Sequence, residues 1–333
     1  MVHKSVLTNG IRVVSERIPS RTVSVGFWID AGSRDETPAE SGCAHFVEHM
    51  LFKGTASRSN EDIARQLDRL GGMSNAFTTR ENTCLYATVL DDQLGELLSL
   101  FAEMLTHSRF AAAEVERERQ VILQEIGMVE DSPEDLSHDL FLANLWGDHP
   151  LGRTILGQRE AVASMTARRL KGFCRRMHVP ANLLVAAAGQ VDHAALVRLV
   201  ETALAVSLPE PPAKAGGVPR IAPRARSGVA LHPRRFEQTH VILGVEGLPV
   251  RSPDRYALNL LNILLGGNMS SRLFQEVREK RGLAYNIYSF VESEGDSGLV
   301  GLYTAVAPAA LGQALEVIRE VVGRMCEREV PGQ

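Results

Sequence analysis

Apolar and polar residues alternate along several short segments of the chain, and elsewhere apolar residues recur every three or four positions. Alternation is typical of half-buried strands, and the longer spacing is typical of amphipathic helices. Apolar residues on both sides of Asn9-Gly10 predict an N-terminal β-hairpin. Further strands are expected at residues 22–29, 74–78, 84–89 and 183–188, and helices at 44–52, 60–70, 92–106, 111–129, 167–176 and 193–205. This order of elements predicts an α+β fold.

A segment rich in proline and glycine, residues 207–228, interrupts this pattern and predicts a linker. The pattern then resumes, with strands expected at 229–232, 239–245, 284–291 and 299–305, and helices at 253–265 and 271–280. The sequence therefore predicts two domains, at residues 1–206 and 229–333.

The two halves resemble each other when the sequence is shifted by 217 residues. Between residues 85 and 98, six of fourteen positions are then identical, including Leu85-Tyr86 with Leu302-Tyr303. The match predicts that the second domain repeats the first. Under this shift Gln333 pairs with Glu116, so nothing corresponds to residues 117–207. We therefore expect the second domain to be incomplete at its C-terminus.

Composition narrows the class of protein. A hydrophobic share of 44% is that of a globular chain, and 36 basic against 40 acidic residues leave a net charge of −4. This balance argues against nucleic acid or anionic membrane as a partner. The N-terminus lacks the pattern of a signal peptide, and the apolar runs are shorter than the roughly 20 residues that span a bilayer. The four cysteines lack metal or redox spacing and predict reduced thiols in a cytoplasmic protein: Cys43, Cys84, Cys174 and Cys326.

His45, Glu48 and His49 form an H-x-x-E-H arrangement in a segment predicted to be helical. On a helix the two histidines lie one turn apart on one face, so both imidazoles can bind one metal ion at about 2.0–2.1 Å. Glu48 lies close to that face, where its carboxylate can accept a proton from metal-bound water as this water attacks a carbonyl. The alternative is a surface helix with incidental histidines.

A hydrolytic zinc site needs a third protein ligand and an open fourth position. The helix expected at 111–129 offers four acidic candidates: Glu114, Glu116, Glu118 and Glu125. Glu118 and Glu125 are seven residues apart and share a helix face. An acidic helix in contact with solvent is the alternative for this segment.

The segment HFVEHM at residues 45–50, followed by FKGT at 52–55, resembles the signature of a known family, the inverted-motif zinc peptidases. This family includes pitrilysin, insulysin and the mitochondrial processing peptidase. The second motif of that family is similar to ERQVILQE at residues 118–125, and Glu125 follows His49 by the 76 residues seen in the family. The resemblance, to a short bacterial type, implies one zinc ion per chain. It implies His45, His49 and Glu125 as ligands, Glu48 as general base and Glu118 as a supporting carboxylate.

A further segment is similar to the family's substrate-binding edge strand, to which an extended peptide adds as another strand. Main-chain hydrogen bonds would then bind peptides of varied sequence. The residues concerned are Asn75, Ala76, Phe77 and Thr78. A plain sheet edge is the alternative.

In the second half, Arg278 and Tyr285 are spaced like a pair of residues that in the family hold the substrate backbone and the oxyanion. The resemblance implies that this pair completes a site whose zinc, base and edge strand come from the first half. The alternative is an ordinary ion-pairing arginine and a strand tyrosine.

For each half the resemblance implies a mostly antiparallel sheet backed by helices, with two homologous domains that face each other as a clamshell. The implied activity is that of a zinc endopeptidase, which cleaves unstructured peptides or N-terminal extensions by glutamate-assisted attack of zinc-bound water. The alternative is a non-catalytic structural or partner subunit of a heterodimeric peptidase. Such members typically lose the H-x-x-E-H residues, which this chain keeps. Expected partners are a peptide substrate and, in a homodimer or heterodimer, a second copy or a related subunit.

Overall fold

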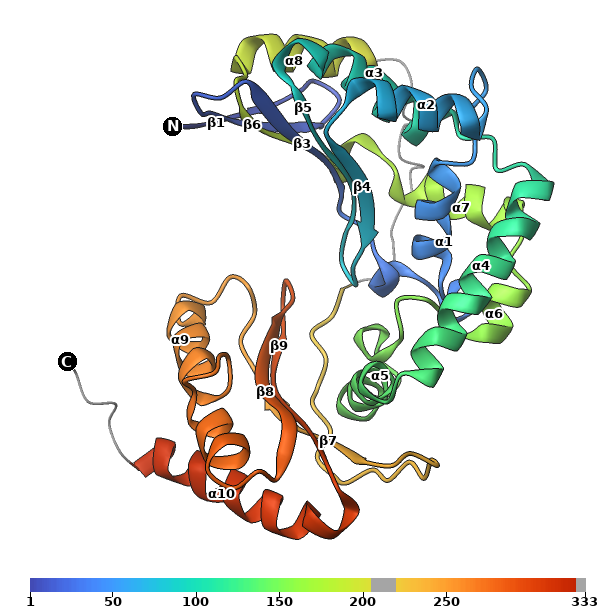
Figure 1. Cartoon of the computed structure of the whole chain (residues 1–333). Coiled ribbons are helices and arrows are strands. Elements are labelled where there is room, and N and C mark those ends of the chain that lie inside the picture. Colours follow the sequence, from blue (N-terminus) through green and yellow to red (C-terminus); the bar gives the residue numbers. More distant parts are fainter. Residues whose placement is uncertain (205–219, 328–333) are drawn as a thin grey trace. The chain divides into compact units, whose positions relative to one another are not determined.

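The computed structural model of the chain describes residues 1–204 and 220–327. Contacts between residues divide it into two units, shown in Figure 1. The first unit contains Met1–Gly127 and Arg153–Arg220, and the second contains Met128–Gly152 and Ile221–Gln333. The expected domains 1–206 and 229–333 stay a prediction. Of the expected linker at 207–228, residues 207–219 lie outside the described residues.

Six strands form one sheet in the first unit, in the order β1-β2-β6-β3-β5-β4. Neighbouring strands are antiparallel except β2 and β6, which are parallel. The mostly antiparallel sheet expected from the resemblance is therefore confirmed. The strands are β1 Val2–Val6, β2 Arg12–Arg17, β3 Thr22–Ile29, β4 Met73–Thr78, β5 Thr83–Leu90 and β6 Leu183–Gly189.

One face of this sheet carries the core. Val23 and Phe27 of β3 are buried, whereas Ser24 between them is exposed on the opposite face. The helices gather on the apolar side of the sheet (Figure 1) and bury their own apolar residues against it. They are α1 Cys43–Leu51, α2 Asn60–Leu70, α3 Leu94–His107, α4 Ala112–Asp131, α6 Arg159–Ala163, α7 Ala167–Met177 and α8 His193–Leu204.

The second unit contains a smaller antiparallel sheet in the order β7-β9-β8. Its strands are β7 Thr239–Glu246, β8 Ala284–Ser293 and β9 Gly298–Val306. Its helices are α5 Pro133–Trp146, α9 Arg255–Leu265, the π-helix η6 Phe274–Glu279 and α10 Leu311–Glu327. Short 3-10 turns in the two units are η1 Ser33–Asp35, η2 Pro38–Glu40, η3 Asp91–Gln93, η4 Pro150–Gly152, η5 Pro180–Asn182 and η7 Pro308–Ala310.

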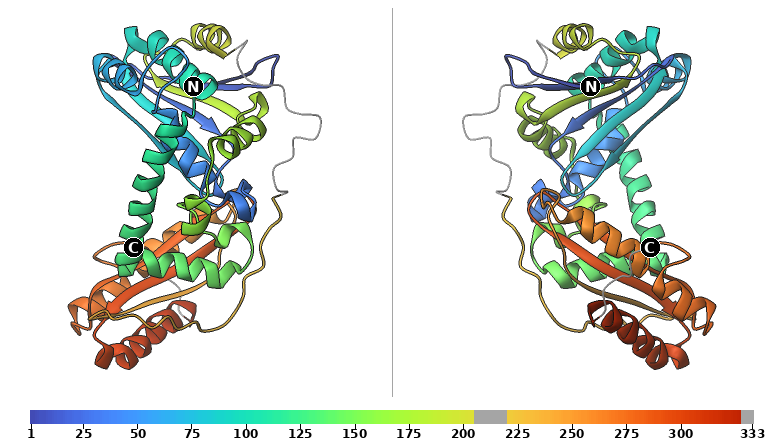
Figure 2. Two further views of the ribbon diagram at one scale, coloured as in Figure 1. Left: turned by 90° about the vertical axis from the view of Figure 1, so that its right-hand side faces the viewer. Right: turned by 90° about the vertical axis from the view of Figure 1, so that its left-hand side faces the viewer.

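Helices cover both faces of the second sheet. Leu302 of β9 packs with residues of α10 and η6, whereas Leu299 packs with Leu142 and Trp146 of α5. Residues 299 and 302 are three positions apart on a strand, so their side chains point to opposite faces. Helix α5, green in Figure 2, therefore covers the face opposite to α10.

The two sheets share one arrangement of strands. The order β4-β5-β3 of the first unit matches β8-β9-β7 of the second. A shift of 217 residues maps Thr22–Ile29 onto Thr239–Glu246 and the first residue of α3 onto that of α10. Among the described residues no strand pairs with the free edge of β7, where β6 would be expected, and Val245 of β7 is exposed.

Some expectations from the hydrophobic pattern are wrong. Residues 229–232 form no strand, and Val229 and Leu231 are 91% and 84% exposed. A short segment with alternating apolar residues is not stable as a strand unless a neighbouring strand pairs with it. The pattern also predicts neither α5 nor α6, and most of the helix expected at 271–280 is the π-helix η6. In the part of the chain that the structure describes, every helix is too short or too polar to cross a bilayer.

Substitution of Gly42, at the start of α1, tests whether the backbone there tolerates a side chain. Its φ is +87°, and a Cβ there would lie 2.5 Å from the Leu156 carbonyl oxygen. Gly42→Ala is therefore expected to lower the free energy of unfolding by at least about 1–2 kcal/mol, measured by chemical denaturation. The matched control is Gly172→Ala in α7, where a Cβ meets nothing within 4 Å and alanine is expected to stabilise the helix. Equal stabilities of the two variants would contradict this interpretation.

Candidate metal centre

The start of α1 is held by a carboxylate that precedes the helix. Glu36 accepts the backbone N–H of Gly42 at 2.9 Å with one oxygen and that of Ala44 at 2.7 Å with the other. The first N–H groups of a helix have no partner within it, so Glu36 satisfies two of these donors. Burial raises the pKa of Glu36 to about 8, against the opposing effect of the two amides. The direction of α1 is thus fixed by a side chain outside the helix.

The two faces of α1 differ in character. Phe46, Val47 and Met50 are buried in the core, and the other face presents His45 and His49. The centroids of the two imidazole rings lie 4.6 Å apart. Helical spacing alone therefore brings the two nitrogen ligands together, as the motif predicts.

Helix α4 brings a carboxylate to the two histidines. Glu125 Oε2 lies 3.8 Å from His45 Nε2 and 3.7 Å from His49 Nε2. One ligand atom from each of the three residues lies within 4.8 Å of the other two, and among the described residues this group alone meets that criterion for a metal site. Two atoms bound to one tetrahedral zinc ion lie about 3.4 Å apart, close to the observed separations.

Burial and charge in this group suit a cation. Glu125 Oε2, the oxygen that faces both imidazoles, is buried and accepts no hydrogen bond from the described residues. Burial, followed by the charge of His49, lowers the pKa of His45 to about 3, so its imidazole is neutral at physiological pH and can donate a lone pair. Two imidazoles and one carboxylate form a donor set that zinc accepts in hydrolytic sites. The residues present therefore fit a zinc ion.

Glu118 links the two helices behind this group. It is 6% exposed, and its Oε2 lies 3.1 Å from His49 Nδ1. Its Oε1 forms an ion pair with Lys53 Nζ at 2.7 Å. A carboxylate on the second nitrogen of a metal-binding histidine fixes the tautomer and the orientation of the ring. The supporting role implied for Glu118 stays a prediction.

The sequence-based prediction gives no role to Lys53, although a signal for one is present. Lys53 follows His45 and His49 by eight and four residues, so it continues the same helical face just past the end of α1. The remaining acidic candidates have other partners, since Glu114 pairs with Arg117 and the exposed Glu116 pairs with Arg119.

Glu48 lies between the histidines and the edge of the sheet. Its Oε2 accepts a hydrogen bond of 2.5 Å from Thr78 Oγ1, at the end of β4. Burial raises the pKa of Glu48, and the hydrogen bond from Thr78 opposes this rise. Glu48 is thus a half-buried carboxylate whose position is set by a residue of the expected substrate strand.

The expected substrate strand does lie at an edge. Among the strands of the described residues β4 is terminal in the sheet order and pairs with β5, and no described strand pairs with its other side. Asn75, Ala76, Phe77 and Thr78 all belong to β4. The Phe77 ring packs edge-on against Trp28 of β3, with centroids 5.5 Å apart.

Arg278 and Tyr285 lie next to each other in the second unit. Arg278 is in η6 and Tyr285 is in β8. The guanidinium carbon of Arg278 is 4.5 Å from the centroid of the Tyr285 ring and 4.7 Å from that of Phe274. The tyrosine side chain is 78% exposed. The two residues thus form one surface feature of this unit.

Comparison with known proteins finds one family over almost the whole chain. The profile named Insulinase (Peptidase family M16) matches residues 12–159, and the profile named Peptidase M16 inactive domain matches residues 164–332. A protein of Streptomyces coelicolor named as an uncharacterized zinc protease is 45% identical over 331 residues, which are 98% of this chain and 72% of that protein. The zinc protease YmxG of Bacillus subtilis, also named uncharacterized, is 39% identical over 98% of this chain and 78% of its own length.

Solved structures show the same fold. A crystal structure described as a peptidase M16 inactive domain from Pseudomonas fluorescens matches with a TM-score of 0.92 at 22% identity, over 99% of this chain and 80% of that chain. A protease from Helicobacter pylori matches with a TM-score of 0.93 at 25% identity, over 99% of this chain and 81% of that chain. The α+β fold with two related domains is thereby confirmed.

The contact between Glu118 and His49 predicts an effect on metal affinity. Glu118→Gln keeps the shape of the side chain but removes the charge that holds His49 and Lys53, so zinc affinity is expected to fall by about 10–100-fold. Competition with a chelator of known affinity measures this change. Glu116→Gln, an exposed carboxylate on the same helix, is the control and should bind zinc like the wild type. Unchanged affinity in Glu118→Gln would show that the contact does not support the metal.

Proposed function

Because the chain belongs to the insulinase-type peptidases of family M16, we propose that it is a zinc-dependent endopeptidase that cleaves unstructured peptides or N-terminal extensions of small proteins. The observation that carries the proposal is the convergence of His45, His49 and Glu125 beside Glu48. An H-x-x-E-H helix alone is compatible with other roles, whereas three metal-binding atoms next to a half-buried carboxylate are arranged for hydrolysis.

The residues of this centre have different proposed roles. His45, His49 and Glu125 would hold the ion, and Glu118 would orient His49. Zinc bound there would lower the pKa of a coordinated water to about 7 and would polarise the carbonyl of the substrate. Glu48 accepts the proton of the attacking water at a carboxylate oxygen and delivers it to the leaving amine.

The edge strand supports a preference for extended peptides. A peptide that pairs with the free side of β4 binds through main-chain hydrogen bonds, which tolerate varied side chains. Thr78 ties this strand to Glu48, so a peptide bond paired near Thr78 is brought close to the base. A folded globular protein does not offer a free strand of this kind, so unstructured segments are the expected substrates.

Arg278 and Tyr285 are included in the proposal as substrate-binding residues. Their contact supports this role, because the guanidinium stacked on the ring holds the exposed tyrosine in one orientation. A phenol and a guanidinium both donate hydrogen bonds to carbonyl oxygens and to the oxyanion that develops during attack.

Substitution of Glu48 tests the mechanism. Glu48→Gln is expected to retain one zinc ion per chain and to lose hydrolysis of a quenched unstructured peptide by about 10²–10⁴-fold, because an amide cannot accept the proton. Metal analysis and initial rates measure the two quantities. Glu116→Gln serves as the matched control with full activity expected. If Glu48→Gln hydrolyses the peptide at the wild-type rate, the mechanism is wrong. If the wild type binds zinc but cleaves no peptide of a diverse mixture, the role of a non-catalytic partner subunit is favoured.

The second unit has its own test. Tyr285→Phe is expected to lower kcat/KM by about 10²-fold with zinc content unchanged, because one hydrogen bond to the oxyanion is lost. Arg278→Met is expected to lower it as well, through loss of the stacked cation. Arg319→Met, an exposed arginine on α10, is the control. Wild-type kinetics in both Tyr285→Phe and Arg278→Met would remove the pair from the substrate site.

A further inference from the structure

Residues 153–163, which include α6, contact both helices that carry the metal-binding residues, and we call them the bridging segment. One part of this segment packs on the start of α1, and its end is held by a side chain of α4, beside which α6 lies in Figure 1. The contact of Glu118 with Lys53 joins α4 to the opposite end of α1. The bridging segment is thus a second connection between the same two helices.

Two hydrogen bonds fix the bridging segment to the start of α1. Arg153 Nη1 donates at 2.8 Å to the backbone carbonyl oxygen of Glu36, the residue whose carboxylate binds the first amides of the helix. The backbone N–H of Gln158 donates at 3.1 Å to Ser41 Oγ, and Ser41 is 1% exposed. Between these contacts, the Leu156 carbonyl oxygen lies against the glycine at which α1 starts. The start of α1 and the bridging segment therefore share one position.

Arg119 of α4 holds the end of the bridging segment. Its Nη1 donates hydrogen bonds of 2.8 Å to the carbonyl oxygens of Val162 and Ala163, the last two residues of α6. Carbonyl groups in the last turn of a helix have no partner within it, so a cationic donor there is favourable. The Arg119 side chain is 13% exposed, whereas that of Glu116, its ion-pair partner, is 62% exposed. An exposed ion pair contributes little, so the carbonyl contacts hold Arg119 in place.

The bridging segment is packed into the core between its two attachments. Val162 is 0% exposed and belongs to the core cluster that also contains Val47 of α1 and Ile122 of α4. Packed interiors have few voids, so they transmit a displacement instead of absorbing it. A shift of α4 is therefore passed through the bridging segment to the start of α1.

We propose that Arg119 and Ser41 are positioning residues, which act through the bridging segment to set the distance of the zinc ligand on α4 from the two ligands on α1. Arg119 precedes Glu125 by six residues, and Ser41 precedes His45 by four, so both anchors lie within two helical turns of a ligand. Metal–ligand distances vary by only about 0.2 Å, so a small shift of either helix lowers affinity. The inference rests on the zinc site of the proposed function and adds two residues that support this site without binding the ion.

Zinc affinity, measured by competition with a chelator, tests the two residues. Arg119→Met and Ser41→Ala are each expected to weaken zinc binding by about threefold to tenfold. Removal of a cation from α4 would by charge alone strengthen zinc binding, so a loss of affinity in Arg119→Met reports position and not charge. The matched control, Arg117→Met, removes an exposed arginine from the same helix and should bind zinc at least as tightly as the wild type.

The double variant and a second metal separate positioning from general stability. If both residues act through the bridging segment, the loss of affinity in the double variant should be smaller than the product of the single losses. Cobalt(II) bound in place of zinc has a visible absorption spectrum that depends on ligand geometry, and this spectrum should shift in both single variants. A purely structural role would lower the unfolding midpoint of the metal-free chain and leave the cobalt spectrum unchanged.

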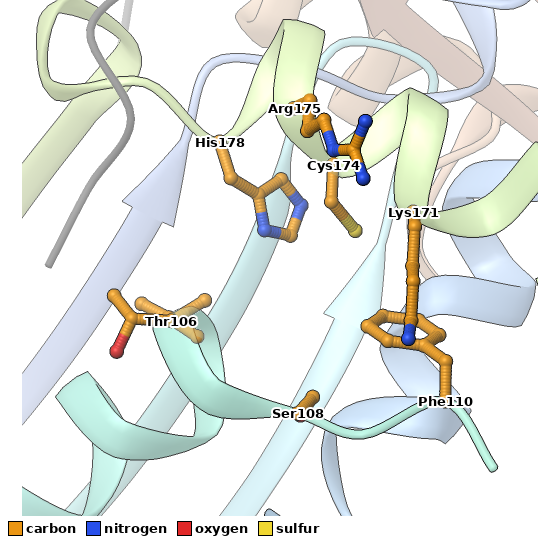
Figure 3. A pocket seen from close by; sticks show the side chains of 8 residues that line it. Thr106, Ser108, Phe110, Lys171, Cys174, Arg175 and His178 are labelled. Carbon is orange, nitrogen blue, oxygen red and sulfur yellow. The ribbon is translucent and has the colours of Figure 1, made fainter. Parts of the chain in front are cut away.

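A remote control is available at the pocket between α7 and the end of α3, which Figure 3 shows. None of the residues that line this pocket belongs to α1, α4 or the bridging segment. Lys171→Met removes an exposed cation there and should leave both zinc affinity and the cobalt spectrum unchanged.

Three results would overturn the proposal and leave the peptidase function intact: wild-type zinc affinity in both Arg119→Met and Ser41→Ala, losses that multiply in the double variant, or an unchanged cobalt spectrum in both single variants. A wild-type chain that binds zinc but cleaves no peptide would instead contradict the proposed function alone.

Discussion

The contact of Glu118 with His49 and Lys53 is the interaction on which the candidate metal centre depends. Two ligands come from α1 and the third from α4. The distances from Glu125 to the two histidines therefore depend on how these two helices pack against each other. Glu118 is the side chain of α4 that reaches both the ring of His49 and the ammonium group of Lys53. A carboxylate this deeply buried is costly unless it is paired, and its two partners are His49 of α1 and Lys53, just past the end of that helix. The same contact therefore stabilises the packing of the helices and sets the geometry of the ligands.

The sequence predicts the parts of this centre that depend on local spacing. His45 and His49 are neighbours because a helix places them so, and the face shared by Glu118 and Glu125 follows from the same periodicity. Spacing alone left four acidic candidates for the third ligand, and only resemblance to a family selected Glu125. The contacts that cross between distant segments could not be predicted: Glu36 on the start of α1, Thr78 on Glu48, and α5 against the second sheet. Each depends on tertiary packing, which hydrophobic periodicity does not encode.

The repeat explains why the described part of the second unit has no counterpart of this centre. The shift that maps β3 onto β7 also maps His45, Glu48 and His49 onto Asn262, Leu265 and Gly266, at the end of α9. These residues cannot reproduce the ligand pair or the base, so the second unit keeps the scaffold of strands and helices without this chemistry. Leu260 and Ile263 of α9 are 63% and 46% exposed, whereas the corresponding helix α1 buries most of its apolar residues. The two units thus share the order of three strands, but their corresponding helices differ in the side chains that they carry.

The division of the chain into units does not follow its order. The backbone passes from one unit to the other at 127/128, 152/153 and 220/221. Since α5 precedes Arg153 yet packs on β7 and β9, a single backbone cut cannot yield one fragment that is the first unit and another that is the second. A fragment that begins at residue 221 would leave α5 behind, and its sheet would stay attached through the contacts of Leu299 with Leu142 and Trp146. The chain shares its family with proteases, so cleavage of its own backbone is a relevant event. A single cleavage between the units would leave two fragments that stay associated through the packing of α5 on the second sheet.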